Sequence, residues 1–386
     1  MCFEGDFAQI LRFRGIFVTF QIHYLTTNQE FKLQMRRFFL IIVMAMVMGD
    51  AIGQELRRFS RGADISWVTE LESRGTKFCD FEGNEMECTA LMKELGLDAI
   101  RLRVWVNPER GFNGKEDVIE KARRAKRLGM DIMIDFHYSD TWADPGKQYI
   151  PASWKEHSYK EMLKDVYKHT KDVLESLKKE RIEPRWVQVG NETTNGLLWP
   201  VGAVDKHPDQ YAGLIKSGCK AVKKVFPKCK TIVHLDNGFD QGLYDYNLGI
   251  LEKYGVNYDI IGMSLYPLAA VEYHSDKVRS AKAAIDKCIM NMDYQNRKLG
   301  KECIITEVGV KVTRPDEGYE LLKYLMDKIT TDCETPCRGV FYWEPEAAVG
   351  YNGGYDMGAF EKDEEGRNRP TKIIAALRAF GKASPF

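Results

Sequence analysis

The chain has 386 residues, of which 44% are hydrophobic and 29% are charged, a composition typical of a globular protein with one large domain or two ordinary ones. Its 56 basic and 56 acidic side chains cancel, so the overall charge does not favour nucleic acid or an anionic membrane as a partner. We expect no nucleic-acid binding, and the balance is compatible with a neutral ligand.

The amino-terminal region has the pattern of an export signal. Arg36-Arg37 precede an unbroken apolar run from Phe38 to Met48, which is too short to span a bilayer in the usual way. Ala51-Ile52-Gly53 then supplies the small residues that a signal peptidase reads. We therefore expect a signal peptide over residues 35–53 and an exported protein, periplasmic or extracellular, with no stable membrane insertion.

The position of Met35 directly before the two arginines suggests that it is the true start. Residues 1–34 would then be an upstream extension, although a genuine N-terminal arm is the alternative. The mature chain, residues 54–386, would begin at Gln54, and we expect it to act as a monomer.

The cysteines are consistent with export without proving it. Apart from Cys2 there are eight, an even number, and close spacings would permit local bridges. The pairs are Cys79/Cys88, Cys219/Cys229, Cys288/Cys303 and Cys333/Cys337. Buried free thiols are the alternative. No cysteine or histidine cluster has the spacing of a zinc site, so we expect no structural zinc and no cofactor.

From Arg61 onward, short apolar runs alternate with longer amphipathic stretches, the pattern of a parallel sheet wrapped by helices. The eight apolar runs are residues 62–65, 99–105, 131–137, 186–192, 231–236, 260–266, 303–307 and 339–343. Eight strands in a chain of this length predict a single (β/α)8 TIM barrel.

Helical patterns occupy several of the gaps between these runs. The predicted helices are residues 115–128, 159–179, 210–225, 277–292, 317–328 and 371–380. No proline- or serine-rich linker and no internal repeat marks a second domain, so one barrel over residues 54–386 is the simpler interpretation.

Polar and aromatic residues gather at the ends of these predicted strands. In a barrel of this kind the active site is built from the carboxyl ends of the strands and the loops that follow them. The residues at those positions are Arg101, Arg103, His137, Asn191, Glu192, Asp236, Asn237, Tyr266, Glu307 and Trp343. Their convergence from most of the strands predicts one shared cleft.

Glu192 and Glu307 are the candidate catalytic residues. They end the fourth and seventh apolar runs, and a retaining glycosidase needs one carboxyl group that donates a proton and one that attacks the anomeric carbon. A surface carboxylate is the alternative for either residue alone. Both end a strand-like run in the correct order, which favours the catalytic interpretation.

Arg101 and Arg103 lie on the same face of their predicted strand, because side chains alternate with period two. If that face is the barrel interior, one guanidinium could bind the ionised nucleophile and keep its pKa low. We expect this to be Arg103, which is nearer the rim, although a purely structural salt bridge would also explain it.

The remaining candidates point to carbohydrate binding. We expect His137 to bind sugar hydroxyl groups rather than to transfer protons, and Tyr266 to hydrogen-bond the nucleophile or the ring oxygen. Trp343 and the rim residue Trp142 could stack on sugar rings, although core packing explains most tryptophans. Asn191 and Asp236 complete the predicted substrate-binding set.

Several longer motifs resemble glycoside hydrolase family 53, the endo-β-1,4-galactanases. They include Arg101-Leu102-Arg103-Val104-Trp105-Val106-Asn107-Pro108, the block Asp135 to Gly146, Val189-Gly190-Asn191-Glu192, Thr306-Glu307 and Tyr342-Trp343-Glu344-Pro345. The resemblance implies a (β/α)8 enzyme that cuts internal β-1,4 bonds of galactan in type I arabinogalactan with retention. It also implies that Glu192 is the acid/base and Glu307 the nucleophile.

The chain departs from some bacterial members of that family, which carry calcium in an extended loop after the seventh strand. Here residues 308–315 lead quickly into a helix without an acidic ligand set, so we expect no calcium from that source. A shorter loop would also shorten the binding cleft.

Two other interpretations stay open. The same two glutamates would serve a barrel glycosidase acting on β-mannan, xylan or glucan, and the scaffold could also belong to a non-catalytic carbohydrate-binding protein. The presence of both glutamates argues against the latter. A retaining pair is expected to lie roughly 5–5.5 Å apart, and a separation near roughly 9 Å would indicate inversion.

Overall fold

The computed structural model describes residues 8–13, 16–21 and 59–378. The chain divides into two compact units, Met1–Arg57 and Arg58–Phe386. In the first unit, β1 (Ala8–Phe13) pairs antiparallel with β2 (Ile16–Gln21). The expected signal peptide and its cleavage site lie outside the described residues, as do the last residues of the predicted helix 371–380.

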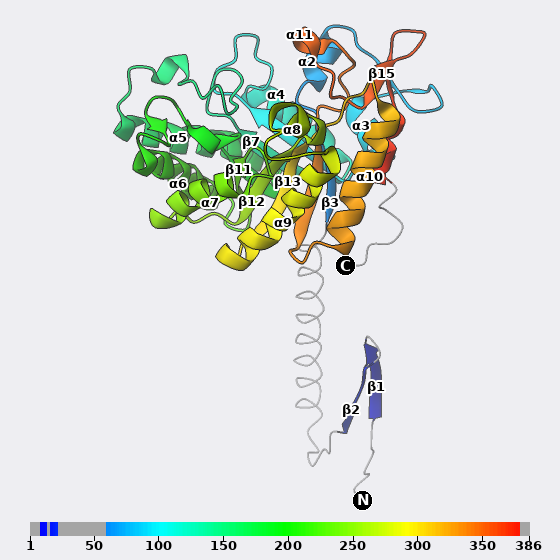
Figure 1. Ribbon diagram of the computed structural model, residues 1–386, viewed down its shortest axis with the longest axis horizontal. Coiled ribbons are helices and arrows are strands. Elements are labelled where there is room, and N and C mark those ends of the chain that lie inside the picture. Colours follow the sequence, from blue (N-terminus) through cyan, green and yellow to red (C-terminus); the bar gives the residue numbers. More distant parts are fainter. Residues whose placement is uncertain (1–7, 14–15, 22–58, 379–386) are drawn as a thin grey trace, which may run out of the picture. The chain divides into compact units, whose positions relative to one another are not determined.

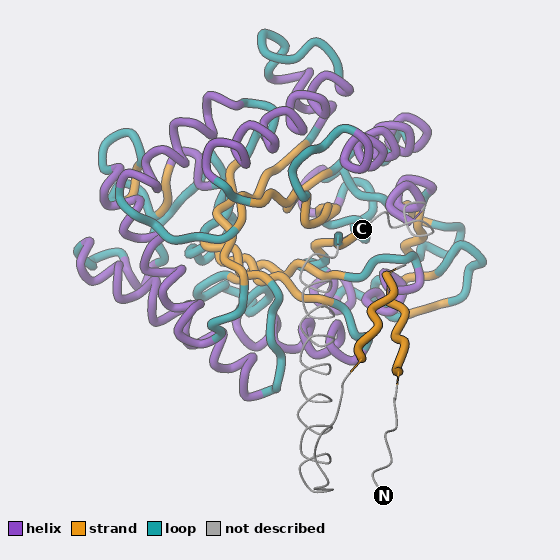
Figure 2. Tube along the Cα trace, turned by 90° about the horizontal axis from the view of Figure 1, so that it is seen from below, coloured by secondary structure: helices purple, strands orange, loops and turns teal. Residues whose placement is uncertain are grey.

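The second unit is built on a closed parallel barrel, seen end-on as a ring of strands in Figure 2. Its strands are β3 (Ser60–Asp64), β6 (Ala99–Val104), β7 (Asp131–Phe136), β8 (Trp186–Val189), β11 (Lys230–Leu235), β12 (Ile260–Leu265), β13 (Glu302–Val308) and β14 (Cys337–Trp343). Each strand pairs with the next in chain order, and β14 pairs with β3 to close the ring. The predicted (β/α)8 TIM barrel is confirmed, and each predicted strand overlaps an observed one.

Helices surround this ring (Figures 1 and 2). The longer ones are α4 (Lys115–Arg127), α5 (Tyr159–Lys179), α6 (Pro208–Val225), α7 (Gln241–Lys253), α9 (Ala281–Leu299) and α10 (Pro315–Thr331). The shorter ones are α2 (Val68–Ser73), α3 (Cys88–Glu94), α8 (Pro267–Tyr273), α11 (Tyr351–Gly354) and α12 (Lys372–Arg378). All six predicted helices overlap observed ones, whereas α7 was not predicted because Gly242, Asn247 and Gly249 weaken its helical signal.

Local sequence signals explain why the helices begin where they do. Ser158 and Glu161 form a capping box at the start of α5, in which the Glu161 carboxylate accepts a hydrogen bond from the Ser158 backbone at 2.8 Å. At the start of α9, the Ser280 hydroxyl group accepts a hydrogen bond from the Ala283 backbone N–H at 3.2 Å, and proline begins α6, α8 and α10. These signals fix the length of the loops that connect helices to strands.

Short strands and 3-10 turns lie in the loops of the barrel. A four-stranded sheet joins β4 (Phe78–Cys79), β5 (Glu85–Met86), β15 (Phe360–Lys362) and β16 (Asn368–Pro370), so the loop after β3 meets the chain after β14. β9 (Gly196–Leu197) and β10 (Gly202–Ala203) form a hairpin, and two 3-10 turns cover Ala152–Trp154 and Thr193–Asn195. Strands of two or three residues leave too short a sequence signal to be predicted.

The barrel interior changes from apolar to polar along the strands. At the amino-terminal end of the strands, the interior is filled by an apolar cluster that is distinct from the larger core of the protein. Its members are Ala99, Met133, Trp186, Ile232, Ile260, Ile304 and Phe341. Gly62 lies beside this cluster, where a Cβ would be 2.2 Å from the Phe341 ring. Two residues further along each strand, on the same face, the interior is largely polar. That layer contains Asp64, Arg101, Asp135, Gln188, His234 and Thr306, all of them buried.

The cysteines of the described region are all free thiols. Seven are buried and Cys333 is partly exposed, so none of the four local bridges considered from the spacing is present. Burial raises the pKa of most of these thiols, for example that of Cys337 to about 11, which keeps them protonated and poorly reactive. Among residues 59–378, no helix combines the length and apolarity needed to cross a membrane.

Candidate active site

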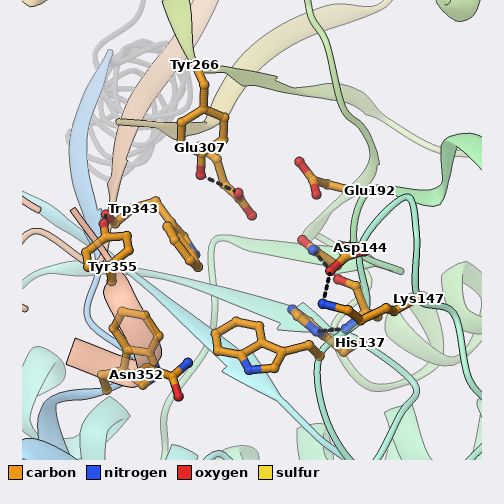
Figure 3. A pocket seen from close by; sticks show the side chains of 13 residues that line it. His137, Asp144, Lys147, Glu192, Tyr266, Glu307, Trp343, Asn352 and Tyr355 are labelled. Carbon is orange, nitrogen blue, oxygen red and sulfur yellow. Dashed lines mark hydrogen bonds and ion pairs between the residues drawn. The ribbon is translucent and has the colours of Figure 1, made fainter. Parts of the chain in front are cut away.

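The carboxyl ends of the barrel strands surround a cavity of about 350 Å³ (Figure 3). Its lining residues come from the ends of six of the eight strands, β3, β7, β8, β12, β13 and β14, or from the loops that follow them. They are Trp67, His137, Trp142, Ala143, Asp144, Lys147, Asn191, Glu192, Tyr266, Glu307, Trp343, Asn352 and Tyr355. Five of the seven predicted substrate-binding residues line this cavity: His137, Asn191, Tyr266, Trp343 and Trp142.

Glu192 enters this cavity through a sharp turn after β8. Gly190 has φ 84° and Glu192 itself is left-handed, with φ 44° and ψ 54°. A left-handed backbone is strained for a residue with a side chain, and a Cβ at Gly190 would lie 2.5 Å from Thr193. The turn directs the Glu192 carboxyl group into the cavity, where Ser264 Oγ donates a hydrogen bond to Oε1 at 2.6 Å.

Glu307 lies near the end of β13 and faces the same cavity from another wall (Figure 3). Arg101 Nη2 lies 2.8 Å from Oε1, and the Tyr266 hydroxyl group donates to Oε2 at 2.8 Å. Each carboxylate oxygen therefore has one donor, and one of these donors is a cation. Both interactions favour the ionised form of Glu307.

The two carboxyl groups have different proton affinities. Burial, followed by the charges of Glu307 and Asp236, raises the pKa of Glu192 well above its usual value. Burial also raises the pKa of Glu307, but Arg101 opposes it, so that this pKa rises only to about 7. Since the two groups interact, they titrate as a pair in which Glu192 keeps the proton.

The predicted role of Arg103 at the nucleophile is wrong, because Arg101 contacts Glu307. Arg101 also binds Asp64 at 2.6 Å and Asp135 at 2.8 Å, and these two buried carboxylates fix its guanidinium group below the cavity. Arg103 instead binds Glu344 at 2.8 Å. An arginine side chain is longer than the rise of two strand residues that separates position 101 from position 103, so either guanidinium group could reach Glu307. The acidic partners of each arginine determine that Arg101 does so.

Arg103 supports the aromatic wall of the cavity from behind. Its guanidinium carbon lies 4.1 Å from the Trp142 ring centroid and 5.8 Å from that of Trp67. Arg103 does not line the cavity, and its Nε and Nη2 have no hydrogen-bond acceptor. These nitrogens therefore face indole rings, where a cation–π interaction replaces hydrogen bonding.

His137 and Asn191 hold the loop after β7 against the site. His137 Nδ1 accepts from the Ala143 backbone at 3.0 Å, so Nε2 carries the proton that it donates to Asp135 at 3.0 Å. Burial lowers the pKa of His137, which keeps the ring neutral. Asn191 donates to Ala143 O and accepts from Arg101, both at 2.8 Å. Both side chains line the cavity, but most of their polar atoms already form hydrogen bonds with other protein groups.

The apolar side of the cavity is a cluster of aromatic rings. Trp343 and Trp142 were predicted, and their ring centroids are 6.0 Å apart. Trp67 packs edge-on against Trp142 at 5.7 Å, and Tyr355 packs against Trp343 at 5.2 Å. This arrangement suits the apolar face of a sugar ring.

Asp236 and Asn237 were expected in the shared cleft, but they line a neighbouring cavity instead of the first one. That cavity, of about 330 Å³, shares Glu192 and Tyr266 with the first but does not include Glu307. Asp236 accepts hydrogen bonds from Thr194 and from Asn237, the latter at 2.7 Å. The predicted single cleft therefore consists of two adjoining cavities that meet at Glu192.

Sequence reasoning missed several residues of the site. Ser264, which donates to Glu192, lies two residues before Tyr266, and side chains with this spacing point to the same face of a strand. Strand alternation could therefore have identified Ser264 as a site residue. Trp67 follows the first strand closely and could have been included as a rim aromatic residue. Asn352 and Tyr355 lie in an irregular loop after β14, where no periodic signal exists. Glu344 and Glu346, both fully buried, were likewise not expected as buried carboxyl groups.

The described part of the chain contains no group of three or more histidine, cysteine, aspartate or glutamate side chains arranged to hold a metal ion. The chemistry available in the cavity is that of two carboxyl groups with unequal pKa values, beside a wall of tryptophans. A (β/α)8 barrel with this arrangement at the carboxyl ends of its strands belongs to the class of glycoside hydrolases.

Comparison with known proteins identifies the family. The model of glycosyl hydrolase family 53 matches residues 60–380, so the chain belongs to this family. A probable arabinogalactan endo-β-1,4-galactanase A of Aspergillus terreus is 32% identical over 74% of this chain and 85% of its own length. An arabinogalactan endo-β-1,4-galactanase of Thermothelomyces thermophilus is 31% identical over 74% of this chain and 89% of its own length.

Solved structures of the family agree with the fold. A fungal β-1,4-galactanase superposes with a TM-score of 0.73 and 27% identity, covering 83% of this chain and 98% of its own. The family 53 catalytic domain of Ignisphaera aggregans gives the same TM-score and identity, covering 84% and 96% of the two chains. The suspected family resemblance is confirmed, and the chain is a galactanase-like glycoside hydrolase.

Proposed function

We propose that this protein is an exported endo-β-1,4-galactanase that hydrolyses internal bonds of galactan and type I arabinogalactan with retention at the anomeric carbon. The observation that carries the proposal is the unequal environment of the two glutamates in one cavity. Glu307 has a cation and a phenol as donors, whereas Glu192 has only the Ser264 hydroxyl group. Retention requires such a division between nucleophile and acid.

In the first step Glu307 attacks the anomeric carbon while Glu192 transfers its proton to the departing oxygen. The glycosidic C–O bond breaks, and an ester bond forms between the sugar and Glu307. Burial raises the pKa of Tyr266 well above its usual value, so its hydroxyl group stays a donor throughout. Arg101 and Tyr266 hold the attacking carboxylate in place.

The second step uses the same two residues. Once Glu307 is esterified, it no longer carries the charge that helps to raise the pKa of Glu192. The pKa of Glu192 therefore falls after the first proton transfer, and the Glu192 carboxylate can take a proton from water. The water oxygen attacks the anomeric carbon and releases Glu307. The interaction between the two groups thus converts the acid into the base.

The assignment of galactan as the substrate is supported by the family and by the aromatic wall of the first cavity. The two fungal relatives at 31–32% identity are named arabinogalactan endo-β-1,4-galactanases, and a neutral polymer suits the neutral net charge of this chain. The tryptophans of the first cavity offer stacking faces for sugar rings. We propose no metal ion or cofactor in the reaction.

Release of reducing ends from potato galactan, β-mannan, xylan and β-glucan tests the substrate. We expect cleavage of galactan with a rapid fall in viscosity, which marks internal cuts. If galactan stays intact while another polymer is cut, the substrate is wrong but the glycosidase mechanism stands. If none of the four is cut, a non-catalytic carbohydrate-binding role gains support. Proton NMR of the first product tests retention, which gives the β-anomer initially.

Export is a separate part of the proposal, supported by the arginine pair and apolar run at residues 36–48. Amino-terminal sequencing of the mature protein from the native cell should begin at Gln54. A protein that retains residues 1–34 would contradict the assignment of this segment as an upstream extension.

A further inference from the structure

The second cavity is not explained by the two-carboxylate mechanism alone. It lies beside the first and is about 330 Å³ in volume. Most of its lining residues come from the ends of β11 and β12 and from α8 with the following His274, and Pro145 and Glu192 complete it. The two cavities share Glu192 and Tyr266. Glu307 and all of the tryptophans of the site belong to the first cavity only. The acid therefore stands at the junction of two spaces, and the nucleophile faces one of them.

This asymmetry decides which part of a substrate fills each cavity. The sugar that is attacked must lie within reach of Glu307, and hence in the first cavity with the tryptophans. The departing oxygen must lie beside Glu192, and the sugars attached to that oxygen extend away from Glu307. From the geometry we infer that the second cavity binds the departing, reducing-end portion of the sugar chain, with Tyr273 and His274 as residues that select its length. This inference rests on the proposed function.

The chemistry of the second cavity fits a neutral sugar. Asp236 is anchored by Thr194 and Asn237, which take two of the roughly four acceptor positions of a carboxylate and leave capacity for a sugar hydroxyl group. Ala269 and Ala270 provide an apolar wall on the other side. Two carboxyl groups (Asp236 and the shared Glu192), an amide and an imidazole lie among small apolar residues, a mixture that suits a polyhydroxylated ring rather than an ion.

Tyr273 is the feature that extends this cavity outward. Its side chain is 72% exposed, although it is large and partly apolar. It ends α8, which begins at Pro267, directly after the Tyr266 that donates to Glu307. His274 follows it, with its ring 5.5 Å from that of Phe239. The exposed phenol is thus connected by one short helix to the reacting centre, in a position to stack on a sugar beyond the one next to Glu192.

The test compares Tyr273→Ala and His274→Ala with wild-type protein and with Tyr246→Ala. Tyr246 is a matched control, because it is a tyrosine with 53% exposure on α7 that lines neither cavity. The substrates are β-1,4-galactotetraose labelled with ¹⁸O at the reducing end, which reveals the bond that is cut, and β-galactobiosyl fluoride, whose leaving group is too small to occupy the second cavity. Thermal unfolding is measured for each variant.

We expect Tyr273→Ala to lower kcat/KM on galactotetraose by about 3- to 10-fold, the loss of one aromatic contact. Without Tyr273, the second sugar of a departing disaccharide loses its contact, so binding modes that place two sugars in the second cavity become weaker. Cleavage should therefore shift toward the bond nearest the reducing end, which releases a single sugar. His274→Ala should shift the pattern in the same direction. Turnover of the fluoride should stay at the wild-type rate in both variants, and Tyr246→Ala should match wild type on both substrates.

An unchanged cleavage pattern in both cavity variants would overturn the inference, as would an equal loss on the fluoride and the tetraose. Both results leave the proposed function intact if the wild-type protein cuts galactan. If the wild-type protein does not cut galactan but cuts another polymer, the same variants are measured on oligosaccharides of that polymer, with the same expected shift.

Discussion

Glu192 and Glu307 are the same residue type in the same cavity, yet the protein surrounds them differently. On the β13 side, Glu307 is held between Arg101 and Tyr266, and Arg101 is itself fixed by Asp64 and Asp135. On the β8 side, Glu192 sits on a left-handed turn with a hydroxyl donor and no cation. The position of one buried guanidinium group therefore helps to divide two identical carboxyl groups into a nucleophile and an acid.

The largest effect is expected from removing the nucleophile. Glu307→Ala should lower kcat on galactan by roughly 10⁵-fold, because the variant lacks the carboxylate on which the covalent intermediate forms. The exposed carboxylate Glu361 provides the control, and Glu361→Ala should behave as wild type. Residual activity within about tenfold of wild type in a purified Glu307→Ala protein would break the assignment.

The next effect separates the acid from the nucleophile. Glu192→Ala should slow galactan cleavage by about 10³-fold, a typical value for loss of a general acid. Formation of the covalent intermediate from β-galactobiosyl fluoride should change much less, because fluoride departs with little help from an acid. Burst kinetics with the fluoride measure this step. Equal losses on the two substrates would mean that Glu192 does not protonate the leaving group.

The pH profile of activity also distinguishes the two glutamates. Activity requires Glu307 ionised and Glu192 protonated, so it should rise as the pH increases through about 7, the pKa of Glu307, and fall as the pH passes the higher pKa of Glu192. Tyr266→Phe removes a donor to ionised Glu307. The acidic limb of kcat/KM should therefore move to higher pH, with a loss of about tenfold at the optimum. A limb that stays in place would contradict the role of Tyr266.

The smallest effect concerns the second arginine. Arg103→Lys keeps a cation near Glu344 but loses the flat contact with Trp142, so the KM for galactan should rise about 3- to 10-fold while kcat stays nearly constant. The acidic limb of the pH profile should not move, because Arg103 does not contact Glu307. A shift of that limb would mean that Arg101 and Arg103 share one role.

The strand order and the two glutamates were predictable because both depend on short-range patterns. Apolar runs of strand length alternate with amphipathic helices, and each glutamate ends such a run. The choice between Arg101 and Arg103 was not predictable, since it depends on acidic partners that are distant in sequence. Asp64 and Asp135 lie on β3 and β7, and Glu344 directly follows β14. The division of the cleft into two cavities depends on α8 and on the loop after β14. Their placement is fixed by tertiary packing rather than by sequence period.

The division of roles between Glu192 and Glu307 is tested most directly by identifying the residue that becomes covalently bound to the sugar. A 2-deoxy-2-fluoro-β-galactobiosyl fluoride slows release of the intermediate, and mass spectrometry of the digested protein locates the label. We expect one equivalent of label on the peptide that contains Glu307, both with wild-type protein and with Glu192→Ala protein. Label on Glu192, or no label together with an α-anomeric first product, would contradict the division of roles between the two glutamates.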